Sequence, residues 1–421
     1  MKLLIFTYAP AGLGHLRVTD ALIDSMPKKY SYIMLGSYDK FITNMHRFTS
    51  TNPIAKWIFT ISQYGLLEDI LTSIYRWVLV STSKQLLIQL KEAIDSKNEI
   101  DEVLVVATHF GMAHQIGAIK DKLAKETGKK IRLVVQVTDD TSQHIWCVKG
   151  ADIIFVPSMF TKQKLEEYAN KKNMKVTFVV TPYPISPSLS NKLDKVNSRY
   201  KELASKEDII NVSVPISGAA VGLSFVTKLI TLLVKKSGRF RFWVLVKKSI
   251  YTKMFLSVIS KLPNVNVITG RNDNEMINLY ELLYQNNIIH IEITKPSEQA
   301  FKAVLSPSLV GGSILLFSSP VGRQEYENIS FLVRHRLMPK SNYSNELNPD
   351  SSLASYPRAV RLSKDPDIAA NFIIWGIDSG YFSKMASDDF KFSEDSIVSG
   401  EVGPNGAKEF WNIVEKKFGQ F

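Results

Sequence analysis

The chain reads Ile-Glu-Ile-Thr-Lys-Pro-Ser-Glu at residues 291–298 and Pro-Val-Gly-Arg-Gln-Glu-Tyr-Glu-Asn at residues 320–328. Each stretch leaves an apolar run for a polar loop, as strands do at the ligand-binding edge of doubly wound folds. At the other end of the chain, the apolar run Lys2–Thr7 leads into Ala-Gly-Leu-Gly-His at residues 11–15, and a helical pattern begins near Leu16. Two halves with separate glycine-rich loops predict a cleft enzyme with one ligand in each half.

Length and composition indicate a globular protein with two domains. A chain of 421 residues is too long for one core and fits two domains of about 150–200 residues. The apolar content of 45% and the charged content of 22% are ordinary for such a protein. The single cysteine, Cys147, excludes an intramolecular disulfide and fits a reducing cytoplasm. We expect no secretory leader and no membrane-spanning helix, because neither pattern is present.

The net charge of +12 is spread over both halves of the chain. It favours contact with nucleotide phosphate or with an anionic membrane. No recognition helix, zinc pattern or aromatic RNA-binding motif accompanies the charge, so we expect no nucleic-acid partner.

Short apolar runs alternate with helical patterns in both halves. This alternation predicts an α/β fold with parallel sheets covered on both faces. The expected strands of the first half are Lys2–Thr7, Tyr32–Leu35, Glu102–Ala107, Arg132–Val137, Asp152–Val156 and Val176–Val180. Those of the second half are Ile209–Val214, Phe240–Val246, Val265–Thr269, Ile288–Ile293 and Ser313–Phe317.

The prolines at 182, 184 and 187 cannot continue a helix or a strand, and they close the first half. We therefore expect an amino-terminal domain at 1–187, a linker at 188–208 and a carboxy-terminal domain at 209–395. Residues 405–421 carry an amphipathic pattern, which predicts a closing helix packed back across the two domains.

Residues 36–90 mix aromatic and aliphatic side chains, among them Trp57 and Trp77, with basic residues such as Arg47 and Lys56. Apolar helices with aromatic and basic flanks can lie in a membrane interface. The same helices can instead cover the sheet, and the pattern leaves both interpretations open.

The loop at residues 11–15 combines backbone freedom with a titratable side chain. Gly12 and Gly14 allow a close backbone approach to a ligand, and the following helix offers unpaired N–H groups. A dinucleotide fingerprint would need Gly or Ala where Arg17 stands, so the loop does not indicate NAD. His15 at the mouth of the loop is a candidate base.

These motifs and their order resemble the GT-B nucleotide-sugar glycosyltransferases of the family 28 branch, over nearly all of residues 1–340. That branch includes the monogalactosyl- and glucosyl-diacylglycerol synthases and the lipid II-forming N-acetylglucosaminyltransferase. In the first half the resemblance rests on four segments: Gly12–His15, Ala107–Phe110, Val137–Asp139 with His144 and Trp146, and Val156–Ser158.

In the second half, residues 217–222 stand where the family has its diphosphate loop, and residues 267–270 where it contacts the base. Residues 294–296 match its Thr-Lys-Pro turn. The resemblance implies that a set of loop and helix-start residues binds the nucleotide-sugar: Ser217, Gly218, Ala219, Gly222, Gly270, Thr294, Lys295, Pro296, Ser297, Glu298, Gln324, Glu325 and Asn328.

The resemblance further implies two Rossmann-like doubly wound domains that face a central cleft. His15 would be the catalytic base, with the acceptor bound by Gly12, Gly14, His109, Asp139 and His144. The nucleotide-sugar would be a co-substrate, and neither a further cofactor nor a metal is expected. The implied reaction moves a hexose from a nucleotide-sugar, with UDP as the expected carrier, to a lipid-linked or other hydroxyl acceptor. The expected location is the cytoplasm, with peripheral contact at the inner face of an anionic membrane.

Departures from the family pattern leave alternatives open. The chain has Ser297-Glu298 where the family continues Gly-Gly, and Ala303 where it places a glutamate; Arg323 also splits the expected Gly-Gln pair. One alternative is a non-catalytic GT-B protein that binds a nucleotide-sugar. The other is a nucleotide-sugar 2-epimerase of the same architecture, which would need several catalytic carboxylates and a histidine.

Overall fold

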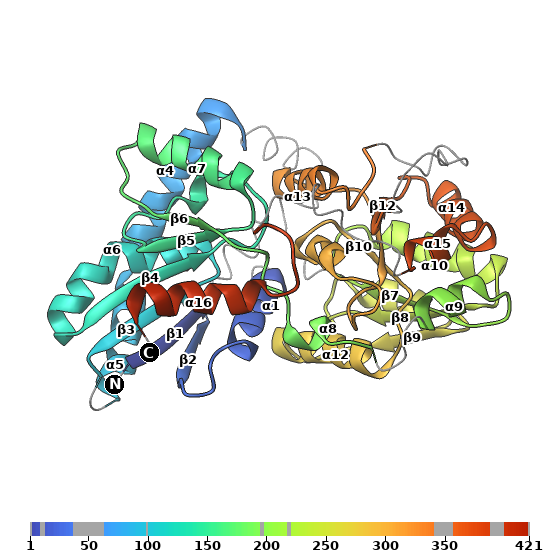
Figure 1. The fold of residues 1–421 in the computed structure, drawn as a ribbon, viewed down its shortest axis with the longest axis horizontal. Helices are drawn as coiled ribbons and strands as arrows, with labels where there is room; N and C mark the ends of the chain where they lie inside the picture. The colour runs from blue at the N-terminus through green and yellow to red at the C-terminus, as the bar shows by residue number, and fades with distance from the viewer. Residues whose placement is uncertain are drawn as a thin grey trace. The chain divides into compact units, whose positions relative to one another are not determined.

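The structure, a computed structural model, describes residues 2–8, 13–36, 63–97, 100–193, 198–216, 220–340, 357–387 and 400–419. Two compact units are formed by the chain (Figure 1). The first unit comprises Met1–Ser186, Gly322–Glu327 and Asn405–Phe421, and the second comprises Pro187–Val321 and Asn328–Pro404. Each unit contains a sheet of six strands within the described part of the chain.

The first unit contains a parallel sheet in the order β2-β1-β3-β4-β5-β6. Its strands are β1 (Lys2–Tyr8), β2 (Tyr32–Gly36), β3 (Glu102–Ala107), β4 (Lys130–Gln136), β5 (Ile153–Val156) and β6 (Phe178–Val180). All six residues of β3 are buried, as expected for a parallel strand that is covered on both faces.

Helices cover both faces of this sheet. They are α1 (Leu13–Asp24), α4 (Gly65–Ser81), α5 (Lys84–Asp95), α6 (Phe110–Thr127), α7 (Met159–Lys171) and α16 (Gly406–Phe418), with the short 3₁₀ helix η1 (His144–Trp146). Ile5 of β1 packs in the same core cluster as residues of α5 and α6. The next residue, Phe6, contacts Trp411 of α16 at a ring separation of 6.1 Å. Alternate residues of one strand therefore serve the two faces.

Helix α16 returns to the first unit from the carboxy-terminal end of the chain (red in Figure 1). Trp411 Nε1 donates a hydrogen bond to the carbonyl of Leu22 in α1 at 2.7 Å. At Gly406, the first residue of the helix, an added Cβ would lie 2.1 Å from the carbonyl oxygen of Pro182. The sequence pattern predicted a helix here, and its described contacts are with elements of the first unit.

The second unit contains a parallel sheet in the order β12-β11-β10-β7-β8-β9. Its strands are β7 (Ile210–Pro215), β8 (Phe240–Leu245), β9 (Val265–Ile268), β10 (Ile291–Thr294), β11 (Ile314–Phe317) and β12 (Ala359–Arg361). Numbered within the unit this order is 3-2-1-4-5-6, the order of the Rossmann fold.

Two helices of the second unit, α8 and α9, lie in the segment expected to be a linker. The described helices of this unit are α8 (Pro187–Ser190), α9 (Ser198–Ala204), α10 (Leu223–Lys236), α11 (Lys253–Ile259), α12 (Asp273–Asn286), the 3₁₀ helix η2 (Glu298–Val304), α14 (Pro366–Asp378) and α15 (Tyr381–Met385). Helix α13 (Arg323–Arg334) begins in the first unit and continues in the second. Arg199 of α9 is buried and donates to the carbonyls of Ile289 and Val310, each at 2.7 Å. The 188–208 segment thus contains structured parts of the second unit.

The predicted pair of doubly wound parallel α/β domains is confirmed. Strand β12 was not predicted, and it adds a sixth strand to the second sheet. Among the described helices, none is both long and apolar enough to cross a membrane. Parts of the predicted segments, among them 37–62, 194–197, 341–356 and 388–395, lie outside the described residues.

Candidate functional site

The first sheet has a topological switch point between β1 and β3. The chain leaves β1 toward β2 on one side, whereas β3 pairs with β1 on the other side. Ligands of open α/β sheets bind at the carboxyl ends of the strands at such a point. Helix α1, which carries Gly14 and His15, follows β1, and Thr108 and His109 follow β3. Gly12 lies outside the described residues.

His15 is held at this edge by its Nδ1 atom. Nδ1 lies 2.7 Å from the carbonyl oxygen of Thr108 and 3.2 Å from Thr138 Oγ1. Because a carbonyl oxygen can only accept, Nδ1 carries the proton in this contact. In the neutral ring the basic lone pair then belongs to Nε2. This tautomer suits a base that removes a proton from a hydroxyl.

A second hydrogen-bonded layer supports the ring. Thr19, one turn further along α1, donates to the backbone carbonyl of His15 at 2.8 Å. The hydroxyls of Thr19 and Thr108 lie 2.8 Å apart, and both residues are buried. The start of α1 is therefore tied to the exit of β3.

Aromatic side chains surround His15. Its ring lies 4.9 Å from the ring of His109 in an edge-on arrangement and 6.4 Å from that of Trp146. His109 is buried and stacks on Phe110 at 4.6 Å. The structure thus brings together two of the predicted residues, His15 and His109, with Trp146 of the family segment.

The two adjacent aspartates after β4 differ in burial. Asp140 is fully buried, and it accepts hydrogen bonds from Ser158 and, at 2.7 Å, from Thr161 Oγ1. Ser158 caps α7 by accepting from the Thr161 backbone N–H at 3.1 Å. Asp140 therefore stabilises the start of a helix. Asp139, the predicted acceptor ligand, is partly exposed in the same turn.

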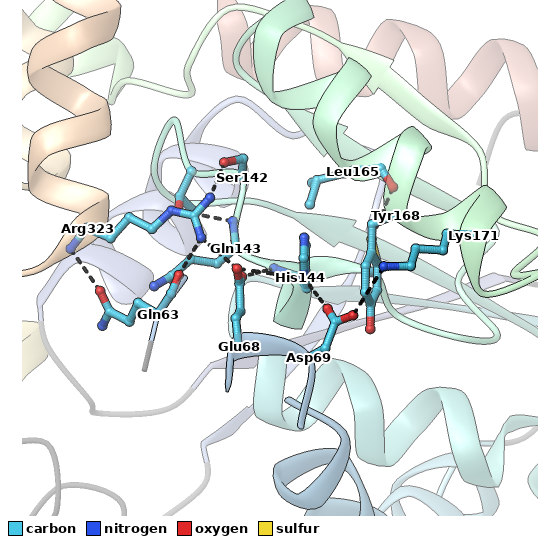
Figure 2. Close-up of polar contacts among 12 residues, drawn as sticks. Gln63, Glu68, Asp69, Ser142, Gln143, His144, Leu165, Tyr168, Lys171 and Arg323 are labelled. Carbon is cyan, nitrogen blue, oxygen red and sulfur yellow. Dashed lines mark hydrogen bonds and ion pairs between the residues drawn. The ribbon is translucent and has the colours of Figure 1, made fainter. Parts of the chain in front are cut away.

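His144 belongs to a different cluster from His15 (Figure 2). Its Nδ1 lies 2.8 Å from Asp69 Oδ1, and its ring stacks on Tyr168 at 3.9 Å. The backbone N–H of His144 donates to Glu68 Oε1 at 2.8 Å. Burial acts to raise the pKa of Asp69, but the hydrogen bond with His144 and the nearby Lys172 and Lys171 hold that pKa below its ordinary value.

The same cluster contains Arg323, the residue that departs from the family pattern (Figure 2). Arg323 Nη1 donates to Glu68 Oε2 at 2.8 Å, and Nη2 donates to Ser142 Oγ at 2.6 Å. Nε lies 3.0 Å from Glu327 Oε1. Burial opposes the charge of Arg323, but the carboxylates of Glu327 and Glu68 raise its pKa. This cluster fixes the first turn of α13, which also carries Gln324 and Glu325.

Sequence reasoning missed Glu68 and Asp69. They are the only acidic residues of α4, and an isolated acidic pair in an apolar helix was the available signal. Arg323 was noted only as an interruption, and its partners Glu68 and Ser142 cannot be read from local spacing.

In the second sheet the switch point lies between β7 and β10, which pair with each other. The residues after β10 form a tight turn with their neighbours. Thr294 Oγ1 lies 3.1 Å from Gln299 Oε1, and Asn328 Nδ2 donates to the carbonyl of Pro296 at 3.1 Å. Asn328 is fully buried. Two of the predicted residues, Pro296 and Asn328, are therefore in contact.

The loop after β7 ends at Gly222, the residue before α10, with φ +82°. Ala220 also has a positive φ, +53°, which is uncommon for a residue with a side chain. The N–H groups at the start of α10 point out of the helix at this switch point, as in anion-binding sites. Ser217, Gly218 and Ala219 lie outside the described residues. Gly270 is packed against Met276, whose Sδ would lie 2.9 Å from an added Cβ.

A buried ion pair lies behind the turn after β10. Glu292 of β10 is fully buried and accepts from Lys302 Nζ at 2.9 Å and from Tyr280 at 2.8 Å. Tyr284 also donates to Glu292, and burial and the Glu292 charge raise the pKa of that phenol well above its ordinary value. Lys302 belongs to η2, whose first residue is Glu298. The network anchors the segment that carries the predicted donor residues Lys295, Ser297 and Glu298.

No group of three or more His, Cys, Asp or Glu side chains in the described ranges is placed to hold a metal ion. Cys147 is buried, and burial raises the pKa of its thiol to about 12. It therefore remains a thiol at neutral pH.

The two parallel-sheet Rossmann-like domains are those of the GT-B fold. No family model and no curated protein matches the sequence. Among solved structures, the chain is similar to the S. aureus MnaA–UDP co-structure, with 11% identity, a TM-score of 0.52, and coverage of 99% of this chain and 97% of that chain. A UDP-GlcNAc 2-epimerase from Neisseria meningitidis bound to UDP-GlcNAc has the same identity of 11% and TM-score of 0.52, over 99% and 100% of the two chains. The spinosyn rhamnosyltransferase SpnG has 11% identity and a TM-score of 0.50, over 99% and 100%.

Proposed function

We propose that the protein is a glycosyltransferase that moves a hexose from a UDP-sugar to a hydroxyl of a lipid-linked acceptor. The observation that carries this proposal is the His15 ring, whose Nδ1 donates to the Thr108 carbonyl at the switch point of the first sheet. A ring in that tautomer can accept the proton of an acceptor hydroxyl at Nε2.

In this proposal the acceptor binds to the first unit, where His109, Asp139 and His144 contribute with the Gly12–Gly14 loop. The acceptor oxygen forms a bond to the anomeric carbon of the sugar as the bond from that carbon to the diphosphate breaks. His15 takes the hydroxyl proton, and UDP leaves with the negative charge. N–H groups at the start of α10 and the Lys295 ammonium stabilise that charge.

The donor residues are proposed on the second unit and on the first turn of α13. The turn formed by Thr294, Lys295 and Pro296 lies at the switch point of the second sheet, where such folds bind nucleotides. Gln324, Glu325 and Asn328 contact the sugar in this proposal. Glu298 takes the place of the glutamate that is missing at Ala303 and binds the ribose hydroxyls.

The location proposed for the protein is the cytoplasmic face of a membrane, because the acceptor is lipid-linked. The net charge of +12 favours contact with anionic lipid. The exposed apolar side chains within residues 63–90, including Leu66 at 77% and Trp77 at 72%, give the membrane a surface to contact.

A calorimetric titration with UDP, UDP-glucose, UDP-galactose, UDP-N-acetylglucosamine, GDP and NAD tests the donor site. We expect saturable binding of one UDP-sugar, weakened at least tenfold by Lys295→Ala or Glu298→Ala. Lys261→Ala, which removes an exposed lysine from another part of the second unit, is the matched control and should bind as the unchanged protein does. Absence of binding by every nucleotide would reject the proposal.

The second candidate is a nucleotide-sugar 2-epimerase. One of the similar structures is described as such an enzyme with its UDP-sugar bound, and the same histidine and nucleotide sites would serve it. NMR of the protein incubated with UDP-N-acetylglucosamine alone separates the two reactions. Appearance of a 2-epimer without an acceptor supports the epimerase, whereas sugar transfer that requires an added acceptor supports the transferase. Tight donor binding without either reaction would indicate the non-catalytic alternative.

A further inference from the structure

Helix α4 (Gly65–Ser81) has its polar and apolar faces reversed. Its three charged residues, Glu68, Asp69 and Arg76, are buried or partly buried on the protein-facing side, as is Thr72. The outward side carries aliphatic and aromatic residues. Surface helices of globular proteins normally show the opposite distribution, with apolar residues toward the core.

The apolar residues on the outward side form one patch. Of the 22 large apolar side chains that are exposed in the described part of the chain, eight lie on α4, so the exposure is concentrated and not scattered. The most exposed are Leu66 at 77%, Trp77 at 72%, Ile70 at 55% and Ile74 at 54%. Concentrated exposure of this kind marks an interaction surface.

The surroundings of the patch favour an anionic lipid surface as its partner. Lys171 and Lys172, at the end of α7, lie 3.8 and 3.5 Å from Asp69 at the first turn of α4, and their side chains are 67% and 38% exposed. Trp77 and Tyr64 add aromatic rings, which concentrate at membrane interfaces. An apolar helix face with aromatic residues and neighbouring lysines fits an interface that carries negative charge.

The inward side of α4 is tied to the first turn of α13 (Figure 2). Glu68 Oε2 accepts from Arg323 Nη1 at 2.8 Å, and the two side chains are only 8% and 12% exposed. Arg323 also donates to the carbonyl of Gln63, next to the start of α4, at 2.6 Å. Gln324 and Glu325 follow Arg323 in the same helical turn.

We infer that the outward face of α4 docks on an anionic lipid surface and that the Glu68–Arg323 ion pair transmits this docking to the first turn of α13. The consequence for donor binding rests on the proposed function, because only there do Gln324 and Glu325 contact the sugar. Arg323 and Glu68 are positioning residues in this arrangement.

The physical reason lies in how α4 is held. In water the large apolar side chains of its outward side stay 40–77% exposed, so the polar contacts of its inward side contribute to its attachment. Contact with lipid buries the outward side and stabilises the helix in place. Since the partner of Arg323 is a buried carboxylate on α4, ordering α4 also orders the residues around Arg323.

Docking is tested by co-sedimentation of the full chain with vesicles that contain 30% phosphatidylglycerol in phosphatidylcholine (about one-third anionic lipid). We expect the double variant Leu66→Ser/Trp77→Ser to lose at least tenfold in partition coefficient. The matched control, Leu282→Ser/Ile368→Ser, removes two exposed apolar side chains of the second unit and should stay within twofold. Unchanged vesicle binding by the Leu66/Trp77 variant overturns the inference. In that case, a change of oligomeric state from dimer to monomer in the variant would show that the apolar face of α4 binds a second copy of the chain.

Transmission is tested by hydrogen–deuterium exchange of the peptide that covers residues 322–327, which needs no nucleotide. Vesicles should slow exchange of this peptide about fivefold. Glu68→Gln, which keeps an acceptor oxygen for His144 but removes the charge, should lose the slowing while it still binds vesicles. Arg323→Gln should behave in the same way, and Glu68→Gln decides the result if Arg323→Gln does not fold.

The control for transmission is Arg132→Gln on β4, which removes the ion pairs with Glu102 on β3 and with Asp152 just before β5 and should keep the slowing. Slowing that persists in Glu68→Gln overturns the coupling. The calorimetric titration with UDP-sugars is a separate readout: failure there rejects the donor site, whereas failure of the exchange experiment rejects the coupling alone.

Discussion

Two histidines of the first unit, His15 and His144, have opposite environments. His15 contacts neutral oxygens, the carbonyl of Thr108 and the hydroxyl of Thr138. His144 contacts the carboxylate of Asp69 at 2.8 Å and is stacked on Tyr168. The family resemblance predicted His15 as the catalytic base and His144 as an acceptor ligand, and the structure gives the two rings different contacts.

The difference shows how the partner of one ring nitrogen determines what the other can do. A neutral acceptor fixes the tautomer of His15 without adding a charge, so its ring can still gain a proton and lose it during a reaction. The described contacts of His144 join α4, η1 and α7, so this residue helps to hold the three helices together, whereas His15 suits proton transfer.

His15→Ala should have the largest effect on activity. We expect kcat to fall by about 10²–10⁴-fold, the usual contribution of a general base, while donor affinity stays within a few-fold. Steady-state kinetics with calorimetry of donor binding measures both. Thr19→Val is the control, because it removes hydrogen bonds from the support of the ring but leaves both ring contacts in place. Turnover that is unchanged in His15→Ala would reject the catalytic role.

A third histidine, His114 of α6, gives the largest expected pH effect on stability. Burial, with the nearby Arg76, lowers the pKa of His114 to about 4, although its hydrogen bond with the Ile145 carbonyl acts in the other direction. Its folded-state pKa is below its unfolded value, so its stabilising contribution is complete above about pH 6.5 and is lost as the pH falls toward 4. The loss should be about 3 kcal/mol.

Chemical denaturation between pH 7 and pH 4 measures this loss. His114→Gln keeps a donor for the Ile145 carbonyl but does not titrate, so its free energy of unfolding should depend less on pH. Equal pH dependence in the two proteins would show that His114 is not the group responsible.

His144→Phe should affect stability more than chemistry. The phenyl ring keeps the stacking on Tyr168 but cannot bond Asp69, whose carboxylate retains only the longer contacts with Lys171 and Lys172 among those described. We expect a loss of about 1–2 kcal/mol and a fall in kcat of less than tenfold. Thermal denaturation and kinetics on the same preparation measure these two effects. A loss of kcat as large as that of His15→Ala would contradict the division of roles.

Most of the fold could be predicted from the sequence because its strands are continuous apolar runs. All of β3 is buried, and its residues Glu102–Ala107 were predicted without error in their bounds. Strand β12 has three residues, too few to show a period, and its pairing with β11 depends on tertiary contacts. Helices α8 and α9 were missed because prolines and polar residues in 182–208 also fit a linker, and burial of Arg199 cannot be read from local spacing.

The candidate site could be predicted only where its residues follow a strand. His109 comes two residues after β3, and His15 follows the loop after β1, so parallel strands place both at one edge. Two partners of Arg323, Ser142 and Glu68, are 181 and 255 residues away in sequence, and no local pattern links them to it. Glu292 stood in the opening stretch as a single charge in a strand, but its partners Tyr280 and Lys302 come from two other elements.

Thr138→Val gives the smallest expected effect, and it tests which contact of Nδ1 sets the tautomer of His15. Valine has the shape of threonine but cannot form a hydrogen bond with His15 Nδ1, whereas the Thr108 carbonyl, at 2.7 Å, remains. The backbone carbonyl of residue 138 still accepts from Tyr183, so folding should be little affected. We expect kcat to fall two- to fivefold, which is less than about 1 kcal/mol, with the pH dependence of kcat unchanged. A fall of more than a hundredfold would show that Thr138, and not the Thr108 carbonyl, sets the tautomer of His15, because only the hydroxyl is lost in this variant.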